Sequence, residues 1–150
     1  MSSTRLDRPP AEVLLIEDSH PDARLIEEIL LNGRAPKHVR VVRGGGEALS
    51  FLRRTGVYVD APRPNLVVLD LNLPGIDGRE VLRQIKNDPA LRCIPVVVFT
   101  TSGAPTDVRQ AYDLQANAYI VKPVGLDAFT DVIRVVEEFW LAIAQRPGTP

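Results

Sequence analysis

Several short apolar runs along the chain end on residues that could take part in chemistry: Glu17 and Asp18, Asp70, Thr100 and Thr101, and Lys122. Crowded carboxylates repel one another, and oxygen ligands without a neighbouring His or Cys suit Mg²⁺ or Mn²⁺. Mg²⁺ also binds phosphate oxygens, for which an ammonium and a hydroxyl are suitable further partners. These residue types therefore indicate phosphoryl chemistry, in which Asp70 would be the carboxylate nucleophile and would form an acyl phosphate.

Such chemistry requires elements that bring the ends of the runs together. The runs are rich in β-branched residues and predict parallel strands, of which the second is the weakest: residues 13–16, 39–42, 66–69, 95–99 and 118–121. Apolar residues at helical spacing separate the runs, so the chain predicts an α/β fold with helices on both faces of a parallel sheet. Right-handed crossovers favour a flavodoxin-like (βα)5 doubly wound sheet with strand order 2-1-3-4-5. Ligands of such sheets bind outside the carboxyl ends of the strands, where the candidate residues lie.

Each candidate residue also has an ordinary structural explanation when it is taken alone. Asp70 could form a turn or cap a helix, and Lys122 could be a solvated loop lysine. Glu17 and Asp18 could favour the N-terminus of the following helix, where Ser19 is the predicted cap. The functional interpretation depends on the coincidence that all these strand ends carry residue types that one reaction needs.

Length and composition predict one domain with no membrane or nucleic-acid partner. The chain has 150 residues, which suits a single domain at residues 11–145 between flexible ends at 1–10 and 146–150. A formal net charge of −1 without a basic block argues against nucleic acid as the main partner. The sequence has no secretory signal and no apolar run of roughly 18–20 residues that could span a membrane, which predicts a cytoplasmic protein. The single cysteine excludes an intrachain disulfide.

Lysine is rare in this chain. Only three of the 18 Lys and Arg residues are lysine, namely Lys37, Lys86 and Lys122. Where arginine is the usual cation, a retained lysine can mark a position that needs a compact and flexible point charge. Of the three, only Lys122 has a predicted role.

The residues at the strand ends resemble the receiver domain of bacterial two-component response regulators. The resemblance is carried, in order and spacing, by Glu17-Asp18, LDLNLPGIDG at residues 69–78, Thr100 and YIVKP at residues 119–123, and it covers about residues 12–140. It implies that Asp70 accepts a phosphoryl group from a histidine kinase or a phosphotransfer histidine. It also implies that Thr100 and Tyr119 form a switch pair, in which the hydroxyl moves to the phosphate and the ring turns inward behind it.

The same resemblance implies a magnesium site and a partner for the phosphoryl group. Asp18 matches the residue that binds Mg²⁺ directly, Glu17 its partner that acts through water, and Asn72 the position whose backbone carbonyl completes the site. Lys122 matches the lysine that pairs with the phosphoryl group. The following Pro123 is cis in this family, although only about 5–6% of X–Pro bonds in proteins are cis.

Some features depart from the common receiver pattern. The acidic pair is Glu-Asp instead of Asp-Asp, and Val124 stands where an aromatic residue often follows Lys-Pro. Residues 53–65 form an extended loop. Together with the Ile-Glu-Asp strand end and the sequence FTTS, this loop resembles stand-alone regulators paired with bacterial phytochromes. The resemblance therefore predicts a phytochrome histidine kinase as the partner.

The residues of the last predicted helix indicate how the domain could pass its signal to other proteins. About a dozen residues follow it, too few for a DNA-binding or catalytic output domain, so we expect signalling through contacts of the receiver itself. Apolar residues beyond its core-facing stripe predict a homodimer face: Val135, Phe139, Trp140 and Ile143, to which Tyr112 would add. The alternative is that these residues only cover the end of the sheet.

Two other functions remain open from the sequence. One is a Mg²⁺-dependent phosphohydrolase with an aspartate nucleophile, but such enzymes usually carry a second carboxylate two residues later, where this chain has Asn72. The other is an adaptor that binds partners without being phosphorylated. The intact set of Asp18, Asp70, Thr100 and Lys122 argues against the adaptor.

Overall fold

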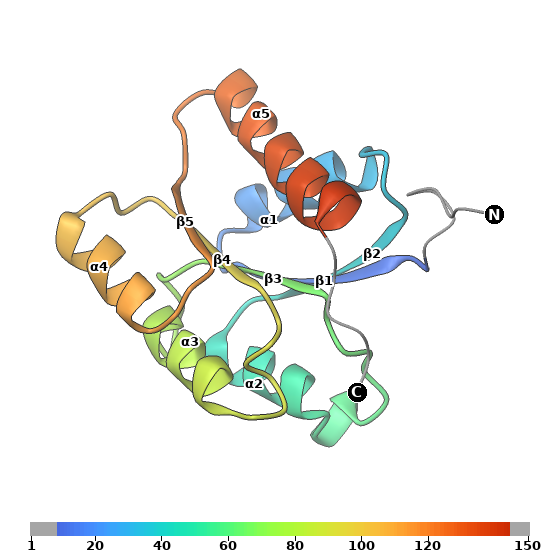
Figure 1. Cartoon of the computed structure of the whole chain (residues 1–150), viewed down its shortest axis with the longest axis vertical. Helices are drawn as coiled ribbons and strands as arrows, with labels where there is room; N and C mark the ends of the chain where they lie inside the picture. Colours follow the sequence, from blue (N-terminus) through green and yellow to red (C-terminus); the bar gives the residue numbers. More distant parts are fainter. Residues whose placement is uncertain (1–8, 145–150) are drawn as a thin grey trace.

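A five-stranded parallel sheet forms the centre of the molecule, with the order β2-β1-β3-β4-β5 (Figure 1). The computed structural model describes residues 9–144, so residues 1–8 and 146–150 of the predicted flexible ends and residue 145 of the predicted domain lie outside it. The strands are β1 (Ala11–Ile16), β2 (Lys37–Val42), β3 (Leu66–Leu69), β4 (Val96–Thr100) and β5 (Ala118–Val121). The predicted flavodoxin-like fold and strand order are confirmed.

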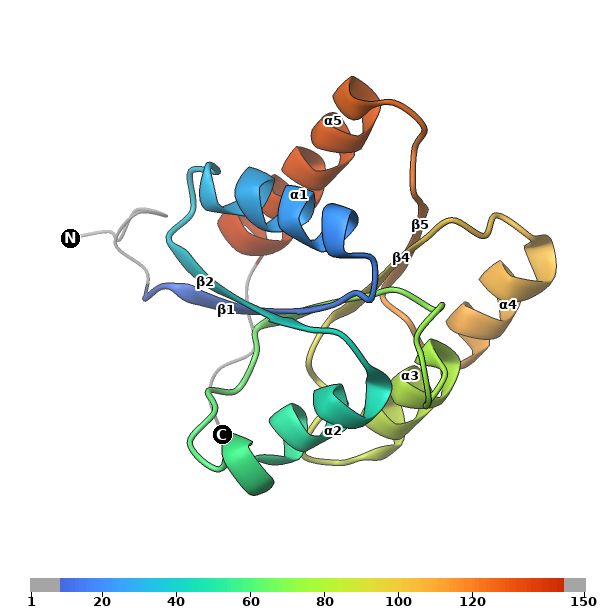
Figure 2. The same ribbon diagram turned by 180° about the vertical axis from the view of Figure 1, so that it is seen from behind.

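Helices cover both faces of the sheet, as Figures 1 and 2 show from opposite sides. One face carries α1 (His20–Leu31) and α5 (Leu126–Glu137). The other carries α2 (Gly45–Arg53), α3 (Gly78–Asn87) and α4 (Pro105–Asp113). A 3₁₀ turn, η2 (Gly56–Tyr58), follows α2, and a π-helical segment, η3 (Glu138–Ile143), continues α5. Within residues 9–144, no helix is long and apolar enough to cross a membrane.

The pleat of the strands divides the interior into two cores. In β1, Leu14 and Ile16 pack with α2 and α3, whereas Val13 and Leu15 pack with α1 and α5. The central strands are therefore apolar on both faces, which explains why their sequences are continuous apolar runs. The edge strand β2 alternates half-buried and exposed positions up to Val41. It begins at Lys37, two residues before the predicted start, and the prediction missed Lys37 and His38 because they are polar.

The start of α3 packs very closely against the backbone at the candidate nucleophile, Asp70, and at Leu71. Asp77 caps this helix by accepting a hydrogen bond from the backbone N–H of Arg79 at 2.8 Å. Gly78 follows, and a Cβ atom there would fall on the backbone oxygen of Asp70 and on Leu71. Glycine is therefore required at this position, because it lets the helix pack directly against the loop that carries Asp70.

The expectation of a cis peptide bond before Pro123 is wrong for this structure. The residues that the structure describes contain no cis peptide bond. The trans isomer of an X–Pro bond is favoured by about 0.5–1 kcal/mol, and it is the isomer found here.

Candidate functional site

Lys122 lies at the centre of a cluster of carboxylates at the carboxyl edge of the sheet. Its Nζ is 2.6 Å from Glu17 Oε1, which follows β1, and 3.2 Å from Asp70 Oδ2, which follows β3. The third partner is Asp22 Oδ2 in the first turn of α1, at 2.8 Å. An ammonium has three donors, so these three carboxylates satisfy it completely.

Apart from Asp22, this cluster is almost entirely removed from solvent. The exposed fractions of the side chains are 2% for Glu17, 6% for Lys122 and 7% for Asp70. Buried charges persist only where they are paired and hydrogen-bonded, because the transfer of a charge out of water is costly. The ion pairs and the hydrogen bond from the Asn72 backbone N–H to Asp70 Oδ1 at 3.1 Å meet this requirement.

Burial and neighbouring charges shift the pKa values of the residues in this cluster, and the two effects often oppose each other. Burial raises the pKa of Glu17 from 4.5 to about 7, with Asp70 adding to the rise and Lys122 opposing it. Burial would also raise the pKa of Asp70, but hydrogen bonds with Glu17 and the Asn72 N–H, together with the Lys122 charge, lower it overall. Burial opposes the charge of Lys122, but hydrogen bonds to Asp22 and Glu17 raise its pKa. Asp70 is thus the carboxyl group kept as an anion.

The raised pKa of Glu17 predicts a pH-dependent stability. Below about 4.5 Glu17 is protonated in both states, and its contribution to folding is complete. As the pH rises through about 7, the folded state must give up a proton that the unfolded chain has already lost, so the free energy of unfolding falls.

Urea unfolding at several pH values, with a chelator to exclude divalent metal, measures this effect. Glu17→Gln removes the ionisable group, so we expect its free energy of unfolding to fall less than that of the wild type between about pH 5 and 8. An equally steep fall in Glu17→Gln would contradict the assignment.

Thr100, the last residue of β4, contributes a hydroxyl with unused hydrogen-bonding capacity. The residue is fully buried, and its Oγ1 makes no hydrogen bond of good geometry within residues 9–144, although its hydroxyl lies close enough to Asp70 to help lower the pKa of that carboxyl. A buried hydroxyl without a partner is unusual and costs stability, which points to a group that binds it in another state.

Tyr119 connects β5 to the loop that follows Thr100. Its ring packs against the core under α4, and its hydroxyl donates a hydrogen bond to the Ser102 carbonyl at 2.7 Å. The Ser102 hydroxyl donates to Asp107 at 2.5 Å, and Asp107 pairs with Arg79 at 2.9 Å. A movement of the loop after Thr100 would therefore be transmitted to Tyr119 and to the starts of α3 and α4.

The predicted metal ligands are only partly brought together. The Asp18 side chain is exposed, and the Asn72 contact to Asp70 uses its N–H and not its carbonyl. Among the described residues, no group of three or more His, Cys, Asp or Glu side chains is arranged to hold a metal ion. Lys122 lies among the carboxylates and contacts Glu17, Asp22 and Asp70. The donors themselves are all hard oxygens of the kind that Mg²⁺ and Mn²⁺ prefer.

Sequence reasoning missed Asp22 as a member of this cluster. The pattern Ser19-x-x-Asp22 indicates a helix cap, and the backbone N–H of Asp22 does donate to Ser19 Oγ at 3.4 Å. Its carboxylate, however, contacts Lys122. No local pattern signals this second role, because the contact joins the first turn of α1 to a residue 100 positions later in the chain.

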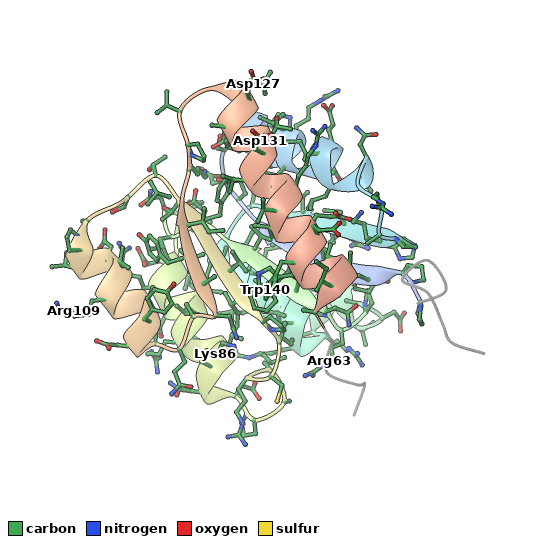
Figure 3. All side chains as sticks on the ribbon, turned by 45° about the horizontal axis from the view of Figure 1, so that its top comes forward. Arg63, Lys86, Arg109, Asp127, Asp131 and Trp140 are labelled. Carbon is green, nitrogen blue, oxygen red and sulfur yellow. The ribbon has the colours of Figure 1, made fainter. Side chains whose placement is uncertain are left out.

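The predicted dimer residues differ in their surroundings. Val135, Phe139 and Ile143 are exposed, and so is Tyr112 on α4. Trp140 is half-buried, packs against the core beneath α1 and α5, and contacts the Phe139 ring edge to face with centroids 5.1 Å apart. Figure 3 shows Trp140 in η3, beyond the end of α5 that lies opposite Asp127. Trp140 thus anchors η3, while its neighbours form the open apolar surface.

Two cavities lie away from the carboxylate cluster. One of about 400 Å³ is beside Arg53 and Arg63, and one of about 420 Å³ lies between α1 and β2. Neither is lined by Asp70, Thr100 or Lys122.

Known proteins are similar to the chain over most of its length. The family described as "Response regulator receiver domain" matches residues 13–134. Response regulator Rcp1 of Synechocystis is 44% identical over 140 residues, which cover 93% of this chain and 95% of that protein. The crystal structure of its Mn²⁺-bound form has a TM-score of 0.90 and 43% identity, and covers 93% of this chain and 100% of that one. The phosphorylated cyanobacterial phytochrome response regulator RcpA has a TM-score of 0.91 and 46% identity, with the same coverages.

Proposed function

Because the chain belongs to the response regulator receiver domain family and is thus a signalling domain of a two-component system, we propose that Asp70 is its phospho-acceptor. The observation that carries this proposal is the placement of a buried carboxylate, Asp70, beside the Lys122 ammonium at 3.2 Å. The lowered pKa of Asp70 keeps it a nucleophile, and the ammonium beside it can exchange its contact with Asp70 for one with an incoming phosphoryl group. The unpartnered Thr100 hydroxyl adds a donor at the same edge of the sheet.

In the proposed reaction, an Asp70 carboxylate oxygen attacks the phosphorus of a phosphohistidine. The new P–O bond gives an acyl phosphate, and the P–N bond breaks as its electron pair returns to the imidazole of the donor. Lys122 then donates a hydrogen bond to a phosphoryl oxygen in place of Asp70, and the Thr100 hydroxyl donates another. When Thr100 moves, Ser102 and the Tyr119 hydroxyl bound to it move as well, and the surface around α4 and β5 changes.

Divalent metal binding is part of the proposal. Glu17, Asp18 and Asp70, with the Asn72 carbonyl, would hold Mg²⁺ or Mn²⁺. When bound, the cation supplies positive charge that lowers the repulsion between these carboxylates and the phosphoryl oxygens. The hard oxygen donors support this assignment, as does the Mn²⁺-bound form of the related Rcp1.

We also propose that the phosphoryl donor is a bacterial phytochrome histidine kinase. The support is the similarity to RcpA, a cyanobacterial phytochrome response regulator. Phosphotransfer from a phytochrome kinase should be at least about tenfold faster than from a kinase of another sensor class, a difference of about 1.4 kcal/mol in the barrier.

Incubation with Mg²⁺ and acetyl phosphate, followed by intact mass measurement, tests the phospho-acceptor proposal. We expect one labile phosphoryl group per chain. Fast turnover of varied phosphoesters would favour a phosphohydrolase instead, although Asn72 offers no second carboxylate for proton transfer. No addition from acetyl phosphate or from a kinase would favour the adaptor.

The domain is proposed to pass on its signal as a homodimer that forms through α5 and η3. The exposed Phe139 and Ile143 lie on η3, so Phe139→Ser combined with Ile143→Ser should weaken self-association about tenfold or more. The control is Val57→Ser in η2, because Val57 is 92% exposed but lies far from α5 in sequence. Sedimentation over a concentration series measures both variants. If the paired substitution and the control behave like the wild type, this face is not the interface.

A further inference from the structure

The three carboxylates around Lys122 differ in their burial and in the element that carries them. Glu17 and Asp70 follow strands and are almost fully buried, with exposed fractions of 2% and 7% for their side chains. Asp22 comes from the first turn of α1, and its side chain is 33% exposed. The third partner of the ammonium is therefore held by a helix and reaches solvent.

The two buried partners are carboxylates that we assign to the metal site. An ammonium bound to Glu17 Oε1 and Asp70 Oδ2 occupies one oxygen of each carboxylate and repels a divalent cation. Lys122 and a metal ion thus compete for the same two side chains. A divalent cation at these side chains would therefore weaken at least one of the Lys122 contacts.

Asp22 gives the ammonium a partner outside the proposed metal ligands. The helix cap holds this residue in place, because its backbone N–H donates to Ser19 Oγ. A carboxylate in the first turn of a helix is also stabilised by the helix dipole. Asp22 can therefore keep an ion pair with Lys122 at 2.8 Å while the other two carboxylates change partners.

We propose that Asp22 is a positioning residue, which retains the Lys122 ammonium when Glu17 and Asp70 bind a divalent cation. Without it, the ammonium depends on the metal ligands alone and competes more strongly with the metal. This inference rests on the proposed function, since it assumes that those two carboxylates are metal ligands.

Calorimetric titration of the full chain with Mn²⁺ tests the role of Asp22. Asp22→Asn should weaken Mn²⁺ binding about tenfold, the lower end of the range for residues that orient metal ligands. Glu27→Gln is the matched control, because Glu27 is also on α1 but lines the cavity beside β2. It removes the same charge and should change the affinity less than about twofold.

Lys122→Met separates competition by the ammonium from simple loss of negative charge. In that background, Asp22→Asn should change Mn²⁺ affinity less than about twofold, because no ammonium remains for Asp22 to hold. If Lys122→Met does not fold, titration of the other variants at about 1 M salt makes the same distinction. Salt screens a general charge effect, whereas the effect of Asp22→Asn through the buried ammonium should persist.

The outcomes separate this inference from the proposed function. Wild-type Mn²⁺ affinity in Asp22→Asn, or an equal loss with and without Lys122, would overturn the role of Asp22 and leave the proposed function standing. If the wild-type chain does not bind Mn²⁺ at all, the proposed metal site is wrong and the inference is overturned with it.

Discussion

Asp70→Asn is expected to abolish phosphoryl transfer to this protein and to leave its fold intact. An amide nitrogen or oxygen is a poor nucleophile, so no acyl phosphate can form at this position. The fold should persist because asparagine keeps the shape of the side chain and an oxygen for the Asn72 N–H. Lys122 also keeps Glu17 and Asp22 as partners.

Intact mass measurement after incubation with Mg²⁺ and acetyl phosphate gives the result directly. The wild type should gain one labile phosphoryl group, and Asp70→Asn should gain none. Asp113→Asn is the matched control, because Asp113 is an exposed aspartate at the end of α4 and should leave the addition unchanged. A phosphoryl group on the Asp70→Asn protein would place the acceptor elsewhere.

The residues at the strand ends could be located from the sequence because topology alone brings them together. Once the strands and their order are predicted, Glu17, Asp70, Thr100 and Lys122 must lie at one edge of the sheet. The rest of the site depends on the directions of side chains. Asp22 points to Lys122, and Asp107 pairs with Arg79, through contacts between elements that no local pattern specifies.

Lys37 and Lys86, like Lys122, occupy positions where a lysine has a specific structural role. Lys37 and Lys86 had no predicted role, yet the ammonium of each contacts three acceptors, as does that of Lys122. Lys86 Nζ donates to the carbonyls of Arg92 and Ile94 and to Asn117 Oδ1, at 2.9–3.1 Å. Three acceptors around one point suit a compact ammonium with three donors better than a planar guanidinium.

Lys37 has the largest expected effect on stability. Its Nζ donates to the carbonyls of Leu30 and Ala35 at 2.6 and 2.5 Å, and lies 3.4 Å from Glu137 Oε1. The side chains of Lys37 and Glu137 are only 2% and 6% exposed. The Glu137 carboxylate also accepts the Ala35 N–H at 2.9 Å and packs against Gly33, where a Cβ would lie 2.7 Å from its carboxyl carbon. This pair joins the turn between α1 and β2 to the end of α5.

Lys37→Met should therefore lower the free energy of unfolding by about 3 kcal/mol, because it leaves the carboxylate of Glu137 buried without its cation. Adding Glu137→Gln removes the unpaired charge and keeps an acceptor for the Ala35 N–H, so the double variant should recover most of the loss. Urea unfolding measures each variant. Arg24→Gln is the control: it breaks the exposed pair with Glu28 and should cost less than about 0.5 kcal/mol.

The double variant decides between the two possible origins of the loss. If it remains as unstable as Lys37→Met, the cost comes from the ammonium's bonds to the Leu30 and Ala35 carbonyls and not from the unpaired carboxylate. If it recovers, the charge pair is what holds the end of α5 against the turn before β2. In that case Lys37→Met should also weaken the self-association proposed for this face, because η3 with Phe139 and Ile143 begins one residue after Glu137.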